Sequence, residues 1–205
     1  MKLFFQKALP HIVAVILFFA LSSIYFSPAF QDYDLRQGDI DQFIGMSKEI
    51  KDYRAVYDSD PLWTNSMFGG MPAYQISVLQ SRSLPAMIIT ALRTIFPGPV
   101  GTLFLALLSF YILGLCMRIN PWVAMLGSIG FGFASVNVLY LGAGHASKVI
   151  AIALMPAVLG GVVLTFRRSI VLGASLTALF GSLQLAANHL QMTYYLLILL
   201  GLVAI

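Results

Sequence analysis

Long apolar runs alternate with short polar segments along most of this chain, and their lengths are the first guide to its fold. A helix needs about 20 predominantly apolar residues to cross a bilayer, because lipid offers no partner to exposed backbone groups. Six runs approach that length: 8–26, 98–117, 121–140, 149–166, 170–187 and 190–205. The pattern predicts an all-α fold, a polytopic transmembrane helical bundle.

One long polar segment interrupts this pattern and divides the chain into three parts. Residues 1–27 hold the first predicted transmembrane helix, 28–97 form a loop, and 98–205 form a bundle of about five helices. The last run reaches residue 205 without a polar flank, so we expect the protein to continue beyond it. Residues 2–24 also fit a signal peptide, although no small-residue cleavage site follows them.

Within the polar segment, apolar side chains recur at the spacing of a helix with one apolar face. Spacings of three and four residues separate Phe43, Met46, Ile50, Tyr53 and Tyr57. Asp39 and Gln42 precede this stripe at the spacing of a capping box, which predicts that the helix starts at Asp39. Such a helix would lie along the membrane surface or against the bundle.

The rest of the polar segment predicts a second short helix and an ordered loop. Residues 86–96 lie between Pro85 and Pro97 and are too few to span, so we expect an interfacial or re-entrant helix. Residues 61–74, PLWTNSMFGGMPAY, combine turn residues with aromatic ones and have no period. We expect this loop to pack on another part of the protein, since its aromatic side chains are costly to leave in water.

Composition supports a membrane protein and excludes several other classes. The chain is 59% hydrophobic and 10% charged, whereas soluble domains carry about 25% charged residues. Its net charge of +4 does not indicate nucleic-acid binding, because basic residues cluster at the ends of apolar runs. Cys116 is the only cysteine, so neither a disulfide framework nor a thiolate metal site is predicted.

The distribution of charge predicts the orientation in a bacterial inner (cytoplasmic) membrane. With the N-terminus in the cytoplasm, the inner segments carry basic residues and no acidic ones. All eight acidic residues lie in the segment 28–97, together with six basic residues, which gives it a net charge of −2. The positive-inside rule therefore places this segment on the extracytoplasmic side, with the short connections at 141–148 and near 188–189.

Two carboxylates of this segment are the best candidates for chemistry. Asp39 and Asp41 precede the aromatic stripe, and a carboxylate partly shielded from water can act as a general base on a hydroxyl group. Asp39 has a competing structural role as a helix N-cap, and the two roles are compatible.

Two short connections on the same side offer groups that could hold a phosphate. His145 and Lys148 lie in the sequence GAGHASK, where small residues permit close backbone approach. The alternative is a tight turn between helices with a lysine that reaches to the surface. His189 and Gln191 begin the last apolar run, where hydrogen bonding between helices would explain them equally well. No metal site is predicted from the histidines, although a divalent cation bound by the carboxylates remains possible.

Several of these stretches together resemble a known family. Residues 37–40 (QGDI), 45–50 (GMSKEI), 61–77 (PLWTNSMFGGMPAYQIS), GHASK and ANHLQMTYY are similar to the N-terminal portion of YfhO-type bacterial membrane proteins, closest to the form associated with Bacteroidetes. The resemblance covers nearly the whole chain.

The resemblance implies a GT-C glycosyltransferase fold, with amphipathic helices and an essential acidic residue in the first outer loop. Such enzymes transfer a sugar from a polyprenyl-phosphate carrier to an acceptor, here a cell-envelope glycan. The acidic role would fall on Asp39, with Asp41 second. The donor phosphate or sugar would be held by the following residues: His145, Lys148, His189, Gln191 and Asn65. No cofactor is implied. Two alternatives remain open: a transporter or flippase of a lipid-linked precursor, and a non-catalytic membrane assembly protein.

Overall fold

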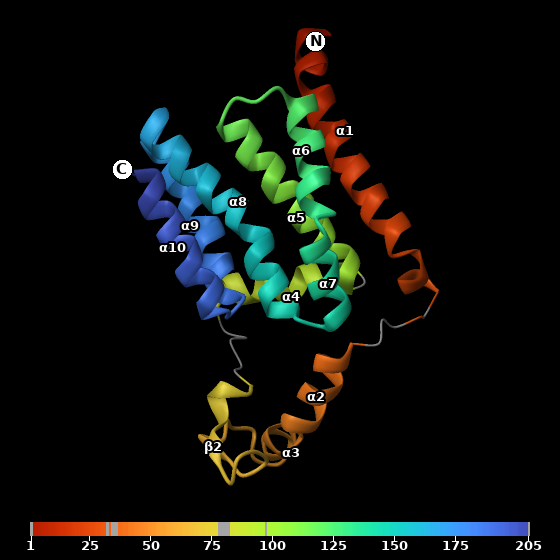
Figure 1. Ribbon diagram of the computed structural model, residues 1–205, viewed down its shortest axis with the longest axis vertical. Coiled ribbons are helices and arrows are strands. Elements are labelled where there is room, and N and C mark those ends of the chain that lie inside the picture. Colours follow the sequence, from red (N-terminus) through yellow and green to blue (C-terminus); the bar gives the residue numbers. More distant parts are fainter. Residues whose placement is uncertain (1, 32, 34–36, 78–82, 97, 205) are drawn as a thin grey trace.

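The computed structural model describes residues 2–31, 33, 37–77, 83–96 and 98–204. It consists of an apolar helical bundle and a smaller polar lobe, residues 37–77, that lies beyond one end of the bundle (Figure 1). We call that end of the bundle the lobe end. The bundle helices are α1 (Lys2–Tyr25), α5 (Gly98–Cys116), α6 (Pro121–Gly132), α7 (Ser135–Ala143), α8 (Ala146–Arg167), α9 (Ile170–Ala186) and α10 (Leu190–Ala204).

Three of these helices are long and apolar enough to cross a membrane, which indicates a membrane protein. They are α1, α5 and α8, and the bent pair α6 and α7 would make a fourth span if it crosses as one unit. Helices α9 and α10 form where the sequence predicts them but contain 17 and 15 residues. Both agree with the predicted runs to within one residue, and both are shorter than the three helices that are long enough to cross a membrane.

The predicted span at 121–140 is broken in its middle. Helices α6 and α7 meet at an angle of 45°. Phe133 and Ala134 interrupt the helix, and the carbonyl of Phe131 accepts hydrogen bonds from the Ala134 N–H at 3.3 Å and from the Asn137 side chain at 2.7 Å. A turn bond and a side chain thus satisfy this carbonyl at the break, as the interior of a membrane protein requires.

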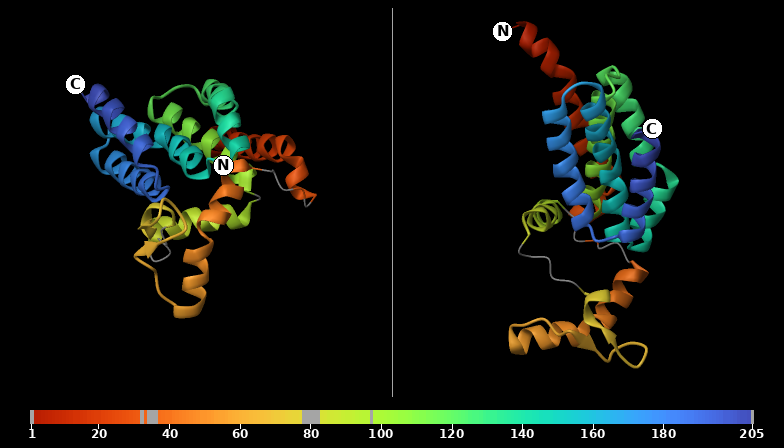
Figure 2. Two further views of the ribbon diagram at one scale, coloured as in Figure 1. Left: turned by 60° about the horizontal axis from the view of Figure 1, so that its bottom comes forward. Right: turned by 90° about the vertical axis from the view of Figure 1, so that its left-hand side faces the viewer.

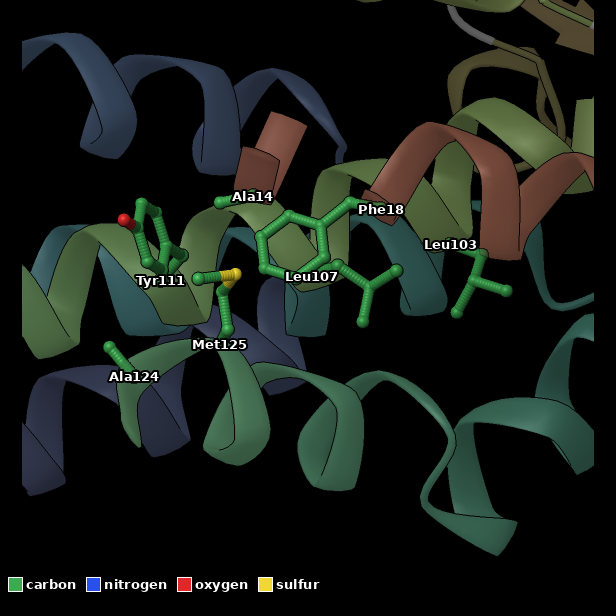
Figure 3. Close-up of a cluster of buried hydrophobic side chains, with 7 residues drawn as sticks. All are labelled: Ala14, Phe18, Leu103, Leu107, Tyr111, Ala124 and Met125. Carbon is green, nitrogen blue, oxygen red and sulfur yellow. The ribbon is translucent and has the colours of Figure 1, made fainter. Parts of the chain in front are cut away.

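Two apolar clusters hold the bundle together. The first joins α1, α5 and α6 and is built around Phe18, Leu107 and Tyr111 (Figure 3). The second joins α4, α8, α9 and α10 and includes Ile89, Leu154 and Met192. Burial of such side chains contributes about 1.5–3 kcal/mol each in water, but in lipid it is close packing that draws helices together.

Helix α8 packs against α5 and α9 and contains a proline. Because Pro156 lies within the helix, the backbone around it cannot form the regular hydrogen-bond ladder. The N–H of Ala157 instead donates to the hydroxyl of Ser109 on α5, at 3.0 Å. Both residues are fully buried or nearly so, so this bond ties α5 to α8 inside the bundle.

Helix α4 (Leu84–Ile95) lies across the lobe end of the bundle (Figures 1 and 2). Ser83 caps its start by accepting a hydrogen bond from the N–H of Ala86, and Pro85 occupies the first turn. Its crosswise direction and its contacts with α5 and α9 fit the predicted short interfacial helix.

The polar lobe contains α2 (Gly38–Met46), α3 (Lys48–Tyr57) and a hairpin of two-residue strands, β1 (Trp63–Thr64) and β2 (Met71–Pro72), in which Thr64 pairs with Met71. Glu49 on α3 holds the hairpin by accepting from the Thr64 hydroxyl at 2.6 Å. Arg54 binds Asp60 and donates to Ser77, which closes the other side. Short 3-10 helices at Ser27–Phe30 and Ala73–Gln75 complete the described elements.

The structure corrects the expectation of one continuous amphipathic helix in the lobe and shows how its apolar side chains lie. The amphipathic helix is not continuous, because Ser47 is a turn between α2 and α3. Of its apolar stripe only Ile50 is fully buried, and Tyr57 is 64% exposed. The loop at 61–74 is an ordered hairpin, but Leu62 and Phe68 are 87% and 88% exposed, so these side chains do not pack on the described part of the chain.

Candidate functional site

The first turn of α2 touches the bundle at the connection between α7 and α8. Gly144 ends α7 with a φ of +94°, a conformation that suits glycine, and its N–H bonds to the carbonyl of Tyr140. The side chain of Gln37 donates to the carbonyl of Leu141. A Cβ atom on Gly144 would lie 2.9 Å from Cβ of Gln37 and 3.1 Å from Cγ1 of Ile40. The glycine therefore permits α2 to approach this closely.

The contact brings together Asp39 and His145, which are 106 positions apart in the sequence. Asp39 Oδ2 lies 2.6 Å from His145 Nδ1. Both side chains are partly exposed, at 48% and 40% respectively, so the pair is open to a ligand. Because Nδ1 faces the carboxylate, it carries the donated proton and leaves Nε2 as the other end of the ring.

Asp39 is not the N-cap that the sequence predicts. Gln37 occupies the N-cap position of α2, and Asp39 is the second residue of the helix. An acidic side chain there still interacts favourably with the free N–H groups of the first turn. Its carboxylate is consequently available to His145 rather than being used to cap its own helix.

Two further basic side chains lie beside the pair. Lys148 Nζ lies 3.8 Å from the centre of the Tyr140 ring, and the same ring packs edge-on against His145. Burial lowers the pKa of His189, although a hydrogen bond to its own backbone raises it, and the positive charges of Lys148 and His145 lower it further. The charges of both groups thus act on His189, and its lowered pKa favours the neutral imidazole.

A small cleft opens next to this cluster. It has a volume of about 210 Å³ and is lined by Gln37, Gly98, Pro99, Thr102, Leu141 and Ala146. These residues come from the first turn of α2 and from the lobe ends of α5, α7 and α8. Most of the lining is apolar, and the volume is below the roughly 300–1,000 Å³ of sites that enclose a whole drug-sized ligand. The cleft therefore suits one part of an amphipathic molecule.

No protein family, curated protein or solved structure matches this chain. A carboxylate, two imidazoles and an ammonium group meet beside an apolar cleft at the lobe end, which suits a ligand with a negatively charged group and an apolar part. Among the residues that the structure describes, no group of three or more His, Cys, Asp or Glu side chains could hold a metal ion.

The structure brings some of the predicted site residues together and leaves others apart. Asp39, His145, Lys148 and His189 gather at the lobe end. Asp41 is exposed on α2, two positions further along. Gln191 is exposed at the start of α10 and donates to the Tyr195 hydroxyl at 2.8 Å.

Asn65 remains within the lobe, where its backbone N–H donates to Glu49 at 3.0 Å. The small residues of GAGHASK, which include Gly144, predicted a close backbone approach. That Gln37 and α2 make this approach depends on the contact between α2 and α7, which no local pattern indicates.

A substitution at Gly144 tests whether its close contact holds the lobe on the bundle. We expect Gly144→Ala to separate α2 from the bundle, because the new Cβ would meet Gln37 and Ile40 at a positive φ. Hydrogen exchange of the α2 amides should rise by about ten-fold or more. Gly142→Ala is the matched control, since a Cβ there would meet nothing within 4 Å. Equal exchange in the two variants would show that this contact does not hold α2.

Proposed function

We propose that this protein is a membrane glycosyltransferase that moves a sugar from a polyprenyl-phosphate donor to an extracytoplasmic acceptor, a cell-envelope glycan. The observation that carries the proposal is the pairing of Asp39 with His145, beside Lys148, His189 and the cleft. A carboxylate and basic side chains are the two kinds of group that this reaction needs at one place. The resemblance to YfhO-type proteins and their GT-C fold supports the same reaction.

The proposed reaction separates the roles of these groups. The acceptor hydroxyl attacks the anomeric carbon of the sugar while Asp39 removes its proton. The bond from the anomeric carbon to the phosphate oxygen breaks, and the polyprenyl phosphate leaves with its negative charge. Lys148 and His145 stabilise that charge, and neutral His189 can donate a hydrogen bond to it.

The contact between Asp39 and His145 links the two roles. His145 Nδ1 lies 2.6 Å from Asp39 Oδ2. A donor phosphate would compete with Asp39 for His145 and so free the carboxylate to meet the acceptor hydroxyl. The apolar cleft would receive the first part of the lipid chain, and membrane lipid would surround the remainder.

We place the protein in the cytoplasmic membrane as a multi-pass protein, with the N-terminus inside and the lobe outside. Arg118, Arg167 and Arg168 support this orientation, because they lie in the connections α5 to α6 and α8 to α9, at the end of the bundle opposite the lobe. The proposed donor and acceptor would then meet on the extracytoplasmic face.

A transporter of a lipid-linked precursor is the second candidate, and the break between α6 and α7 favours it. Broken helices are common at the binding sites of transporters, where free backbone groups bind the substrate. Here the Phe131 carbonyl already accepts a hydrogen bond from Asn137. The break therefore has a structural explanation that needs no substrate. The exposed side chains of Leu62 and Phe68 favour a third candidate, an assembly protein that docks through its hairpin.

Reconstitution distinguishes these functions. The protein is expressed from its native gene and reconstituted in proteoliposomes. These contain a polyprenyl-phosphate donor with a labelled sugar and an unlabelled envelope glycan as the acceptor. We expect label to move from lipid to acceptor at a rate proportional to the amount of protein. Movement of intact labelled lipid between leaflets, without transfer, would indicate a transporter. If neither occurs, the assembly function becomes the better explanation.

A further inference from the structure

Gln184 is a polar side chain in the interior of the bundle, on the last turn of α9. It is 1% exposed, and its Nε2 atom has no hydrogen-bond partner among the residues that the structure describes. Its Oε1 atom accepts a hydrogen bond of 3.0 Å from the hydroxyl of Thr193 on α10. A buried donor without a partner is unfavourable, more so in a membrane interior, and such groups are commonly retained for function.

The surroundings of Gln184 connect it to the basic cluster. The Thr193 hydroxyl also lies 3.3 Å from the carbonyl of His189, so Gln184, Thr193 and His189 form one continuous polar group between α9 and α10. His189 in turn lies close enough to Lys148 and His145 to feel their charges. The rest of the junction is apolar, with Leu183, Ala187 and Met192 all buried.

The unsatisfied groups of this junction are mainly donors. Gln184 offers a buried N–H, and the first backbone N–H groups of α10 point out of the start of that helix. The ammonium group of Lys148, which lies over the Tyr140 ring, adds a positive charge that acts on His189. His189 Nδ1 accepts weakly from the N–H of Met192, at 3.4 Å, which leaves Nε2 to donate. A partner that satisfies all of them must accept several hydrogen bonds and carry negative charge.

We infer that the junction of α8, α9 and α10 at the lobe end is a binding site for a phosphate group on a lipid, and that Gln184 Nε2 is its innermost hydrogen-bond donor. The inference rests on the proposed function only for the identity of the lipid, a polyprenyl phosphate. A phosphate group of a bilayer phospholipid presents the same oxygen atoms. Gln184 would thus be a binding residue that fixes the depth at which the phosphate stops in the bundle.

The test is a measurement of ligand binding, which does not require catalytic turnover. The protein is expressed from its native gene, purified in detergent and titrated with farnesyl phosphate. Its affinity for farnesyl phosphate is then compared with that of the Gln184→Met variant. We expect native protein to bind and the variant to bind about ten-fold more weakly, the effect of losing one hydrogen bond to a charged group. The melting temperature of Gln184→Met should change little, because the substitution removes a buried donor without a partner together with Oε1, and the Thr193 hydroxyl can still donate to the carbonyl of His189.

Two further variants make the interpretation specific. Gln184→Glu replaces the donor by an acceptor with negative charge, so we expect it to bind farnesyl phosphate more weakly than Gln184→Met. Gln75→Met is the control for the same chemical change, since Gln75 is exposed on the lobe. We expect it to bind like the native protein.

The outcomes separate this inference from the proposed function. Equal affinity of native and Gln184→Met, retained affinity in Gln184→Glu, or equal binding of farnesol would each overturn the phosphate site. Those results would leave Asp39 untouched. Competition by phosphatidic acid as strong as by farnesyl phosphate would support the site and assign it to a membrane phospholipid. Loss of transfer in an Asp39 variant that still binds farnesyl phosphate would support both assignments.

Discussion

Replacing Asp39 with asparagine should abolish sugar transfer while the protein still inserts and accumulates in the membrane. Asparagine has nearly the same shape as aspartate but cannot accept the proton of an acceptor hydroxyl. A general base contributes about 10²–10⁴-fold to such reactions, so we expect at least a 100-fold loss. The measurement is transfer of labelled sugar by membranes that contain equal amounts of native protein and variant.

The structure provides a control variant for this experiment and a second candidate for the general base. Asp52→Asn changes a carboxylate of the same lobe that forms an exposed ion pair with Lys48, and it should leave transfer unchanged. Because Asp39 also pairs with His145, hydrogen exchange of α2 must show that the lobe stays docked. Native activity in Asp39→Asn with a loss in Asp41→Asn would move the base to Asp41. Native activity in both would place the base elsewhere.

Gly173→Ala should destabilise the bundle more than an alanine substitution at any other glycine that we have described. Gly161 on α8 faces Thr177 on α9, and Gly173 on α9 faces Thr165 on α8, so each helix presents a glycine to a threonine of the other. A Cβ on Gly173 would lie 2.3 Å from the backbone nitrogen of Thr165. Backbone cannot move aside as a side chain can, so we expect a loss of about 3 kcal/mol or more in the free energy of unfolding.

Thermal unfolding in detergent, followed by tryptophan fluorescence, measures this effect. Gly181→Ala in the same helix is the matched control, because a Cβ there would meet nothing within 4 Å. Since alanine is the better helix former, the control should be unchanged or slightly more stable. A melting temperature for Gly173→Ala equal to that of Gly181→Ala would show that α8 and α9 are not packed this closely.

The close approach of α8 and α9 also explains two hydrogen bonds within the helices. The Thr165 hydroxyl donates to the carbonyl of Gly161 at 2.9 Å, and that of Thr177 donates to Gly173 at 2.8 Å. Each threonine donates its hydroxyl proton within its own helix, and its hydroxyl oxygen and backbone lie against the facing glycine. Small and hydroxyl residues can therefore pack two helices together without leaving a polar group exposed to lipid.

Local signals predicted the helices well where those signals act alone. Pro85 and Pro97 delimit α4, because proline favours the start of a helix and opposes its continuation, and the helix runs from Leu84 to Ile95. The start of α6 is also local: Asn120 caps this helix because its side-chain oxygen accepts a hydrogen bond from the N–H of Trp122. The same local reasoning was wrong for Asp39. Its carboxylate does not cap α2 but lies against His145, which is distant in the sequence.

The sequence by itself determined the membrane class of this protein, the positions of its apolar helices, and the presence of one polar segment with all its acidic residues. These properties follow from run length and composition, which are local. Only the tertiary structure decided that Asp39 meets His145, that Gly144 admits α2, and that Gln184 is buried without a partner for Nε2. Each of these depends on two helices that approach in space, and the period of a single helix does not specify its neighbour.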